Sequence, residues 1–378
     1  MRVIPAWARW NPAGAERPWT VGVEEEVMLL DARTWSVVNR VDDVLGVLPP
    51  PLAARASAET HACVVELKSA ARASVREVAA ELAALRDALD RALLEHLGLR
   101  AAAAGTHPLA IRSEIAVASD ARHREVAATM RALARREPTM ALHVHVAVPD
   151  AACAVRTLDG LRGDLPVLLA LTANSPFWRG SDSGFASMRT PIFSTFPRVG
   201  IPRHFGTYAN WVDLVDRMLS AGAIPEPGFL WWDARLQPRL GTVEVRIMDA
   251  QSRVMDVAVA AAVVHCLVRH HAEHASARAT APEIVAENRF LAARDGMRAE
   301  LVGAHAGRRP AHDALAELLD VCRPHAAALG CAADLASAAE LAADPGDARQ
   351  RRVAARDGIA AVPEWLGEEF GAWVPTPP

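Results

Sequence analysis

Lysine is almost absent from this sequence, and its absence removes several kinds of chemistry. Lys68 is the only lysine, so 41 − 1 = 40 of the basic residues are arginines. A phosphate-binding P-loop needs a lysine within a glycine-rich motif, and the segment Glu66-Leu67-Lys68-Ser69 has no such motif around it. Schiff-base chemistry is disfavoured because no second lysine is available. Phosphate groups, where they are bound, must be met by arginine, backbone amides or a metal ion.

Cysteines and long apolar runs are scarce as well. The 5 cysteines share no CxxC spacing, which is typical of small buried thiols in a reducing compartment. They are Cys63, Cys153, Cys266, Cys322 and Cys331. No apolar run reaches the ~18 residues of a membrane span, and the longest, residues 257–268, contains His265. The amino terminus also lacks a continuous apolar signal region, so we expect a cytoplasmic protein.

Neither sign of charge is in large excess. The chain has 41 Lys and Arg against 45 Asp and Glu, a net charge of −4, and offers no general basic face for nucleic acid or an anionic membrane. With 378 residues, 51% of them hydrophobic, it can bury a sizeable core. We find no internal repeat and no interdomain linker. We therefore expect one domain over residues 1–378, with peripheral tails at 1–18 and 350–378.

Strands are expected in the first two thirds of the chain and helices in the last third. The strand patterns cover residues 20–30, 63–67, 140–148, 229–235 and 242–249. Helices are expected at 74–98, 150–169, 256–276, 284–303, 311–329 and 335–343, the first of them opened by a capping box of Ser74 and Glu77. The absence of regular βαβ alternation favours the α+β class with a largely antiparallel sheet. The long irregular stretch 176–206 is expected to be functional.

Several expected strands carry polar side chains on one face. Alternate residues of a strand share a face, so each pair two residues apart points the same way. The polar positions are Glu24 with Glu26, His143 with His145, Glu244 with Arg246, and Glu66, which follows Glu59 by seven residues. A single such strand could simply turn its polar face to water. Together they indicate one sheet face crowded with carboxylates, which would repel one another unless protonated or bridged by cations such as Mg²⁺ or Mn²⁺.

Two arginines add groups suited to phosphate or carboxylate. Arg246 lies on the carboxylate face and Arg189 lies in the long stretch 176–206. A planar guanidinium binds either anion in a bidentate way. Two simpler alternatives remain open. Arg246 could only form an ion pair with a neighbouring glutamate, and Arg189 could be an ordinary loop residue without a functional role.

A series of short stretches resembles one enzyme family in order and spacing. They are Gly22-Val23-Glu24-Glu25-Glu26, Ala103-Ala104-Gly105-Thr106-His107-Pro108, Leu142-His143-Val144-His145-Val146, Thr172-Ala173-Asn174-Ser175-Pro176-Phe177-Trp178, Arg189-Thr190-Pro191, Gly241-Thr242-Val243-Glu244-Val245-Arg246, Asp249-Ala250-Gln251, and Glu287-Asn288-Arg289 with Ala292-Ala293-Arg294. From about Thr20 to Gly330 the chain resembles the carboxylate–amine ligases of the glutamate–cysteine ligase family, in particular the bacterial type 2 branch.

The resemblance implies an antiparallel sheet curved into a funnel and backed by helices, distantly similar to glutamine synthetase. It implies that ATP and Mg²⁺ (or Mn²⁺) convert a carboxylate to an acyl phosphate, which an amine then converts to an amide of γ-glutamyl type. Carried over by motif, the metal ligands would be Glu24, Glu26, Glu59, Glu66, His143 and Glu244. Arg246 and Arg189 would stabilise phosphoryl or carboxylate charge and, with His145, bind the nucleotide. The expected partners are a small-molecule acid and amine, and a homodimer through helices 256–276 or 311–329 stays open.

Two other classes of function compete with this interpretation. A Zn²⁺ hydrolase could use His143 and His145, but it would need further ligands. The histidines left for that purpose, His265, His270, His271 and His274, lie on an expected helix, where a solvated helix end explains His270 and its neighbours more simply. A polar sheet face could also bind an amino acid or a metal without catalysis.

Overall fold

A single twisted sheet forms the centre of the molecule. The protein is described by a computed structural model that covers residues 4–274, 280–303 and 307–371. The sheet has 7 strands in the order β10-β11-β5-β1-β3-β2, with β4 also paired to β1. Its strands are β1 (Val21–Asp31), β2 (Ala56–Ala58), β3 (Val64–Lys68), β4 (Leu99–Ala102), β5 (Ala141–Ala147), β10 (Ala234–Gln237) and β11 (Thr242–Asp249). Every strand pair in it is antiparallel, so the expected α+β fold with an antiparallel sheet is confirmed.

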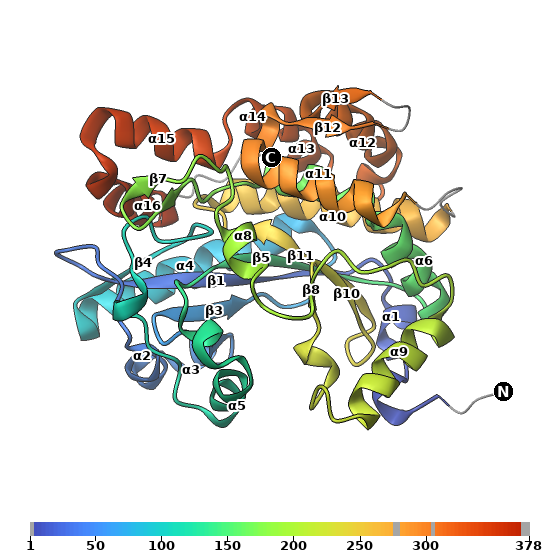
Figure 1. The fold of residues 1–378 in the computed structure, drawn as a ribbon, viewed down its shortest axis with the longest axis horizontal. Coiled ribbons are helices and arrows are strands. Elements are labelled where there is room, and N and C mark those ends of the chain that lie inside the picture. The colour runs from blue at the N-terminus through green and yellow to red at the C-terminus, as the bar shows by residue number, and fades with distance from the viewer. Residues whose placement is uncertain (1–3, 275–279, 304–306, 372–378) are drawn as a thin grey trace.

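Helices lie on both sides of this sheet, and Figure 1 shows α10, α11 and α12 on one side and α2, α3 and α5 on the other. The helices are α1 (Ala13–Glu16), α2 (Val41–Val47), α3 (Pro50–Ala53), α4 (Val75–Leu97), α5 (Ala121–Met130), α6 (Ala151–Leu161), α7 (Leu165–Leu171), α8 (Arg189–Phe193), α9 (Tyr208–Ser220), α10 (Val254–Glu273), α11 (Pro282–Asp295), α12 (Ala311–Ala326), α13 (Ala332–Ala336), α14 (Ala338–Ala343), α15 (Gly346–Asp357) and α16 (Val362–Gly371). Three short pairs complete the strands: β6 (Phe177–Trp178) with β7 (Ser181–Asp182), β8 (Val199–Gly200) with β9 (Trp231–Trp232), and β12 (Glu300–Val302) with β13 (Arg308–Pro310).

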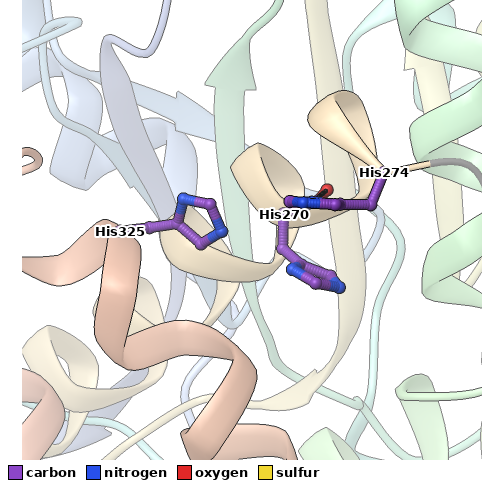
Figure 2. Close-up of side chains that lie close together, drawn as sticks. All are labelled: His270, His274 and His325. Atoms are coloured by element: carbon purple, nitrogen blue, oxygen red, sulfur yellow. Dashed lines mark hydrogen bonds between the residues drawn. The ribbon is translucent and has the colours of Figure 1, made fainter.

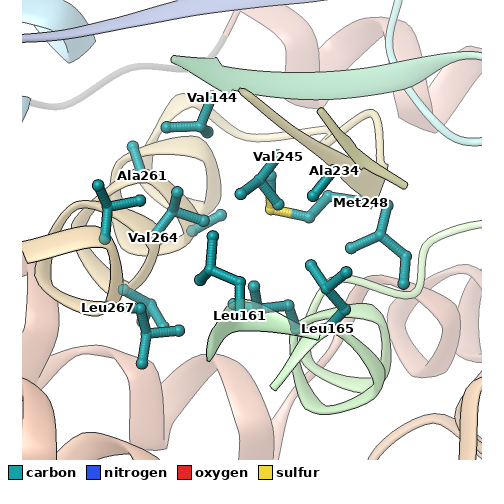
Figure 3. Close-up of a cluster of buried hydrophobic side chains, with 14 of the residues drawn as sticks. Val144, Leu161, Leu165, Ala234, Val245, Met248, Ala261, Val264 and Leu267 are labelled. Atoms are coloured by element: carbon teal, nitrogen blue, oxygen red, sulfur yellow. The ribbon is translucent and has the colours of Figure 1, made fainter. Parts of the chain in front are cut away.

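The larger hydrophobic core lies between the apolar sheet face and α6, α7 and α10. Val144 and Val245 point from β5 and β11 toward Leu161, Leu165 and Val264 of these helices, as Figure 3 shows. Helix α10 is the one described helix long and apolar enough to cross a membrane, and 78% of its most apolar window is buried within the molecule. Most of its apolar surface is therefore used in the core, as in the core helix of a globular protein.

Helix α4 has the ends that its sequence predicts. Ser74 and Glu77 form the capping box, and Gly98 ends the helix in the left-handed conformation at φ 65°. Because a glycine adopts this conformation without steric cost, the chain turns there directly into β4.

Several expected elements differ from the structure. The helix expected over 150–169 is two helices: after a break at residues 162–164, α7 begins at Leu165 with Pro166 in its first turn. The helix expected over 284–303 ends at Asp295, and β12 follows it. Residues 350–371 are not a peripheral tail: they form most of α15 and all of α16, which packs on β4 and α4.

The amino-terminal residues are also less peripheral than expected. Trp7 and Trp10 pack against the larger core, and Tyr208 donates a 2.6 Å hydrogen bond to the carbonyl of Ala8. The ends of both expected tails, residues 1–3 and 372–378, and the last two residues of the helix expected over 256–276 lie outside the described residues.

One buried ion pair fixes the sheet to α4 and to the start of α10. Glu25 points to the apolar face of β1, where Arg86 of α4 binds both of its carboxylate oxygens. The same guanidinium donates to the carbonyls of Ser252 and Gln251 at 2.8 and 2.7 Å. Both side chains are almost completely buried, at 1% and 0% exposure. Each side chain neutralises the charge of the other, which would otherwise be buried in the core without a partner.

Substitution of Arg86 by Met should destabilise the protein by about 3–5 kcal/mol, because the Glu25 carboxylate is left buried and unpaired. Urea unfolding measures this change. The matched control is Arg91→Met on the same helix, where the Arg91–Asp87 pair is 72% and 63% exposed and the change should stay within about 0.5 kcal/mol. Equal effects of the two substitutions would contradict this role of Arg86.

Candidate active site

The register of the sheet brings the acidic strand residues into adjacent rows. Residues directly opposite each other in an antiparallel pair point to the same side. Glu24 of β1 lies opposite His143 of β5 and Lys68 of β3. Two residues further along β1, Glu26 lies opposite Glu66 of β3. These side chains therefore share the sheet face that points away from α10.

The β10–β11 hairpin supplies the other end of this face. Glu244 of β11 lies opposite both His145 of β5 and Arg235 of β10. Arg235 holds the Glu244 carboxylate with its Nε at 2.5 Å and Nη2 at 3.3 Å, and Gln237 donates to it at 2.6 Å. Arg246 also pairs with Glu244. The fully buried Glu244 is thus surrounded by donors.

This polar face forms the floor of a cavity of about 680 Å³. The floor comes from the strands β1, β2, β3, β5, β10 and β11, and the walls come from α2, α5, α8 and the segments beside β9 and β10. The site residues that line the cavity are Glu24, Glu26, Glu59, Glu66, Lys68, His143, His145, Arg189, Arg235, Gln237 and Arg246. Side chains from segments far apart in the sequence therefore meet in one space large enough for small-molecule substrates.

Three overlapping groups on this face have the spacing of metal ligands. In each group, one ligand atom per residue lies within 4.8 Å of the others. The groups are Glu24 with Glu66 and His143, Glu24 with His145 and Glu244, and Glu26 with Glu59 and Glu66. All six residues expected as metal ligands occur in them. Glu59 was predicted only from its spacing along the chain to Glu66. It lies in the loop after β2, and its carboxylate reaches the group that contains Glu26 and Glu66.

Charge is unevenly balanced along the face. At the β3 end, burial and the neighbouring charge of Glu59 raise the pKa of Glu26 well above its ordinary value. Burial, together with the charges of Glu24 and Glu59, raises the pKa of Glu66 to about 7. Lys68 is the only cation that contacts Glu66 among the described residues, with its Nζ 2.7 Å from Oε1. This end of the face has too few cations for its carboxylates.

At the β11 end, the carboxylates are held ionised. Burial opposes ionisation of Glu244, but the charges of Arg235 and Arg246 lower its pKa well below the ordinary value. Burial also opposes ionisation of Glu24, yet its contacts with His143 and His145 lower its pKa strongly.

The two histidines point into the same space with unused nitrogens. Burial, reinforced by Arg246, lowers the pKa of His143 to about 4, so this ring is neutral near pH 7. Burial opposes protonation of His145, but Glu244 and Glu24 raise its pKa overall. The Nε2 atoms of both rings are buried without a hydrogen-bond partner. Orphaned imidazole nitrogens among crowded carboxylates fit a bound cation, and the oxygen-rich donor set suits Mg²⁺ or Mn²⁺.

The two expected arginines have different surroundings. Arg246 lies on the face itself and reaches His143 Nδ1 at 3.2 Å as well as Glu244. Arg189, at the start of α8, donates to the carbonyls of Ile247 and Arg246 at 3.0 and 3.1 Å. These carbonyls lie where the β11–β5 register shifts between Val245 and Met248. Arg189 therefore satisfies an irregular stretch of strand, while its buried Nε remains without a partner at the cavity wall.

Sequence reasoning missed Arg235, Gln237 and Lys68 on this face. The first two could have been found by counting back from Glu244 across the four-residue turn 238–241, which places residue 235 opposite 244. Lys68 follows Glu66 by two residues and so shares its face.

The structure separates the other histidines from His143 and His145. His265 is buried in α10 with its Nε2 2.7 Å from the carbonyl of Trp19. Helix α10 packs on the face that carries Val144, opposite to the two strand histidines. Within the described residues, no metal-spaced group combines a histidine of α10 with either of them. The zinc-hydrolase interpretation therefore lacks its further histidine ligands.

Comparison with known proteins gives consistent matches over most of the chain. The family described as glutamate-cysteine ligase family 2 (GCS2) matches residues 20–369. A protein of Rubrobacter xylanophilus named "Putative glutamate--cysteine ligase 2-3" is 39% identical over 369 residues, covering 94% of this chain and 98% of its own. Another from the same organism, named "Putative glutamate--cysteine ligase 2-1", is 36% identical over 345 residues, covering 90% and 91%.

Two solved structures share the fold at low sequence identity. Glutamate–cysteine ligase from Francisella tularensis, in complex with AMP, superposes with a TM-score of 0.68 at 12% identity, covering 93% of this chain and 89% of that one. A bifunctional glutathione synthetase from Pasteurella multocida gives 0.69 at 12% identity, covering 93% and 52%. At this identity the likeness shows the fold alone.

Mg²⁺ should bind more tightly at about pH 8 than at about pH 5.5. The pKa of Glu66 is raised from 4.5 to about 7 in the folded protein. Without metal, the contribution of this group to the stability of the fold is therefore lost as the pH rises from about 4.5 to about 7. Below pH 7 the ion must displace a proton, which weakens binding by about 30-fold at pH 5.5 through Glu66 alone. Calorimetric titration in buffers of different ionisation enthalpy measures both affinity and proton release.

At about pH 8, Glu66→Gln should bind Mg²⁺ more weakly than the unmodified protein does. Its Mg²⁺ affinity should also differ less between about pH 8 and about pH 5.5. Glu95→Gln, at an exposed position of α4, is the matched control and should behave as the unmodified protein does. Equal affinity of the unmodified protein at both pH values would contradict a role for these carboxylates as ligands.

Proposed function

This chain belongs to the glutamate–cysteine ligase family 2, and on that basis we propose that it is an ATP- and Mg²⁺-dependent carboxylate–amine ligase acting through an acyl phosphate. The observation that carries the proposal is the polar sheet face, on which metal-spaced carboxylates lie beside Arg246 in one cavity. Glutamate is the proposed acid, and cysteine is one amine to be tested. The proposed location is the cytoplasm.

The reaction needs activation because a carboxylate is a poor acyl donor. In the first step a carboxylate oxygen of the acid attacks the γ-phosphorus of ATP, and the bond to the β–γ bridging oxygen breaks, releasing ADP. In the second step the amine nitrogen attacks the acyl carbon and phosphate leaves. The nitrogen loses a proton, and the product is an amide. Phosphoryl transfer of this kind depends mainly on positioning and charge stabilisation.

The acidic residues would hold the metal that such a transfer requires. The proposed ligands are Glu24, Glu26, Glu59, Glu66, His143 and Glu244. When bound, Mg²⁺ supplies neutralisation of phosphate charge. The raised pKa values of Glu26 and Glu66 support ligand roles for them, because a cation relieves the repulsion that favours their protonated forms.

The basic residues would stabilise the transferring group. Arg246 projects from the floor of the cavity, and its charge is maintained because Glu244 raises its pKa despite burial. We assign it to the phosphoryl group or to the substrate carboxylate. Both terminal nitrogens of Arg189 already donate to backbone carbonyls, so only its Nε is without a partner. We therefore propose fewer hydrogen bonds to substrate for Arg189 than for Arg246. His145, whose Nε2 is also unused, is the proposed third contact to the nucleotide.

The segment after α7 forms a fixed wall rather than a free flap. Ser175 and Ser187 donate to the two oxygens of the buried Asp249 at 2.7 and 2.8 Å. Gly105 lies against the same carboxylate, where a Cβ atom would come within 2.6 Å of it. We assign the stretch 176–206, which was expected to be functional, to the exclusion of water from the acyl phosphate, and it would act as a preformed wall.

A non-catalytic amino-acid-binding protein is the alternative to be tested. It would bind the acid without consuming ATP. The homodimer also stays a hypothesis, with the exposed parts of α10 and α12 as its candidate faces.

Incubation with ATP, Mg²⁺, glutamate and a panel of amino acids and amines should yield a product whose mass is the sum of acid and amine less one water. Mass spectrometry identifies the product and its amine, and ADP release should match it in amount. Ligand binding with no ATP consumed across the panel would support the non-catalytic alternative instead.

Glu24→Gln should lower ATP turnover by about 100-fold or more, since it removes a charge shared by two of the metal-spaced groups. The Glu24 side chain is 24% exposed, so the fold should remain intact by circular dichroism. Glu95→Gln is again the matched control and should retain full turnover. Undiminished turnover in Glu24→Gln would remove Glu24 from the site.

A further inference from the structure

Three histidines meet on the helices that cover the other side of the sheet. His270 and His274 lie one turn apart at the end of α10, and His325 lies in the last turn of α12. One ring nitrogen from each lies within 4.8 Å of the others. Figure 2 shows the ring of His325 facing the rings of His270 and His274 across the junction of the two helices.

The cluster is more than the solvated helix end that its sequence suggests. His325 comes from a second helix and is only 8% exposed, whereas His274 is exposed. The rings of His270 and His274 stack with centroids 4.7 Å apart, and the His325 ring meets the His270 ring edge-on at 5.6 Å. The cluster thus has one side in the protein and one side open to solvent.

The ring of His274 is oriented as metal-binding histidines usually are, and the ring of His325 turns its Nδ1 toward a carboxylate. The Nδ1 atom of His274 lies 3.0 Å from the backbone carbonyl of His270 and can only donate to it. The Nδ1 atom of His325 lies 3.6 Å from a carboxylate oxygen of Glu273. A proton kept on Nδ1 leaves the lone pair on Nε2. Metal-binding histidines commonly donate their other N–H to a carbonyl or carboxylate in this way.

Burial favours the uncharged form of two of the imidazoles, and the nearby carboxylates are paired elsewhere or opposed by Arg269. Arg269 pairs with Glu273 at 2.9 Å, and His271 turns away to pair with Asp164 at 2.6 Å. Burial, followed by the nearby histidines, lowers the pKa of His270. Burial also lowers the pKa of His325. Neutral imidazole is the form that binds Zn²⁺, Ni²⁺ and Cu²⁺.

We propose that His270, His274 and His325 bind a first-row transition-metal ion, of which Zn²⁺ is the probe, and that this ion joins α10 to α12. Tetrahedral Zn²⁺ with Zn–N bonds of about 2.0–2.1 Å places its nitrogens about 3.4 Å apart. The three ring nitrogens already lie within 4.8 Å of one another, so small side-chain movements bring them to that spacing. Water can complete the coordination. The site is independent of the proposed ligase activity.

The test is titration of the full chain, without a polyhistidine tag, with Zn²⁺ in excess Mg²⁺ against a chromophoric chelator. The unmodified protein should bind one equivalent more than His274→Gln or His325→Gln. His312→Gln, at an exposed position on α12, is the matched control and should bind as the unmodified protein does. Co²⁺ at the same site should give the intense visible bands of tetrahedral coordination.

Thermal unfolding gives a second measurement that does not depend on catalysis. Zn²⁺ should raise Tm by about 2 °C or more in the unmodified protein and in His312→Gln, but not in His274→Gln. His274 is exposed, so its substitution should leave the metal-free Tm unchanged.

Three results would overturn the proposal. The first is no Zn²⁺ binding by the unmodified protein. The second is equal Zn²⁺ binding by the unmodified protein, His274→Gln and His325→Gln. The third is loss of the bound equivalent in His143→Gln instead, which would assign the Zn²⁺ to the sheet face.

Discussion

The rest of the structure depends on the repulsion among carboxylates that one antiparallel sheet places on a single face. Glu24, Glu26 and Glu66 lie opposite or beside one another in register, in a cavity that strips away most of their water. Such a group is stable only when protonated or neutralised. At the β11 end, Arg235 and Arg246 neutralise Glu244 within the protein itself. At the β3 end, Lys68 is the only lysine or arginine in the described part of the chain that pairs with these carboxylates. The imbalance there is the physical argument for a bound cation.

The other side of the sheet keeps this arrangement in place. The buried pair of Glu25 and Arg86 connects β1, α4 and the start of α10, so the strand that carries Glu24 and Glu26 cannot shift without breaking it. Asp249 similarly anchors the wall that carries Arg189. Preorganised groups of this kind lose little energy in reorganisation when charge develops during a reaction. The stability of one face and the chemistry of the other are therefore linked through the same strands.

Alternation along the strands was enough to predict the polar face, because a period of two needs no knowledge of distant partners. The register, and with it the role of Arg235, follows from the length of the 238–241 turn once the hairpin is recognised. The helices α15 and α16 could not be predicted as part of the core, since the burial of Leu366 and Phe370 depends on contacts with β4 and α4, more than two hundred residues earlier. The metal-spaced cluster of α10 and α12 likewise depends on how two distant helices pack.

The central claim is that this face transfers a phosphoryl group to a carboxylate. The most direct test uses acid labelled with ¹⁸O in its carboxylate, ATP and the amine found to react. An acyl phosphate intermediate predicts that one labelled oxygen from each reacting carboxylate appears in the inorganic phosphate, with ADP as the other product. Label recovered in AMP, or unlabelled phosphate alongside full amide formation, would contradict the account and show that the carboxylate is activated in another way.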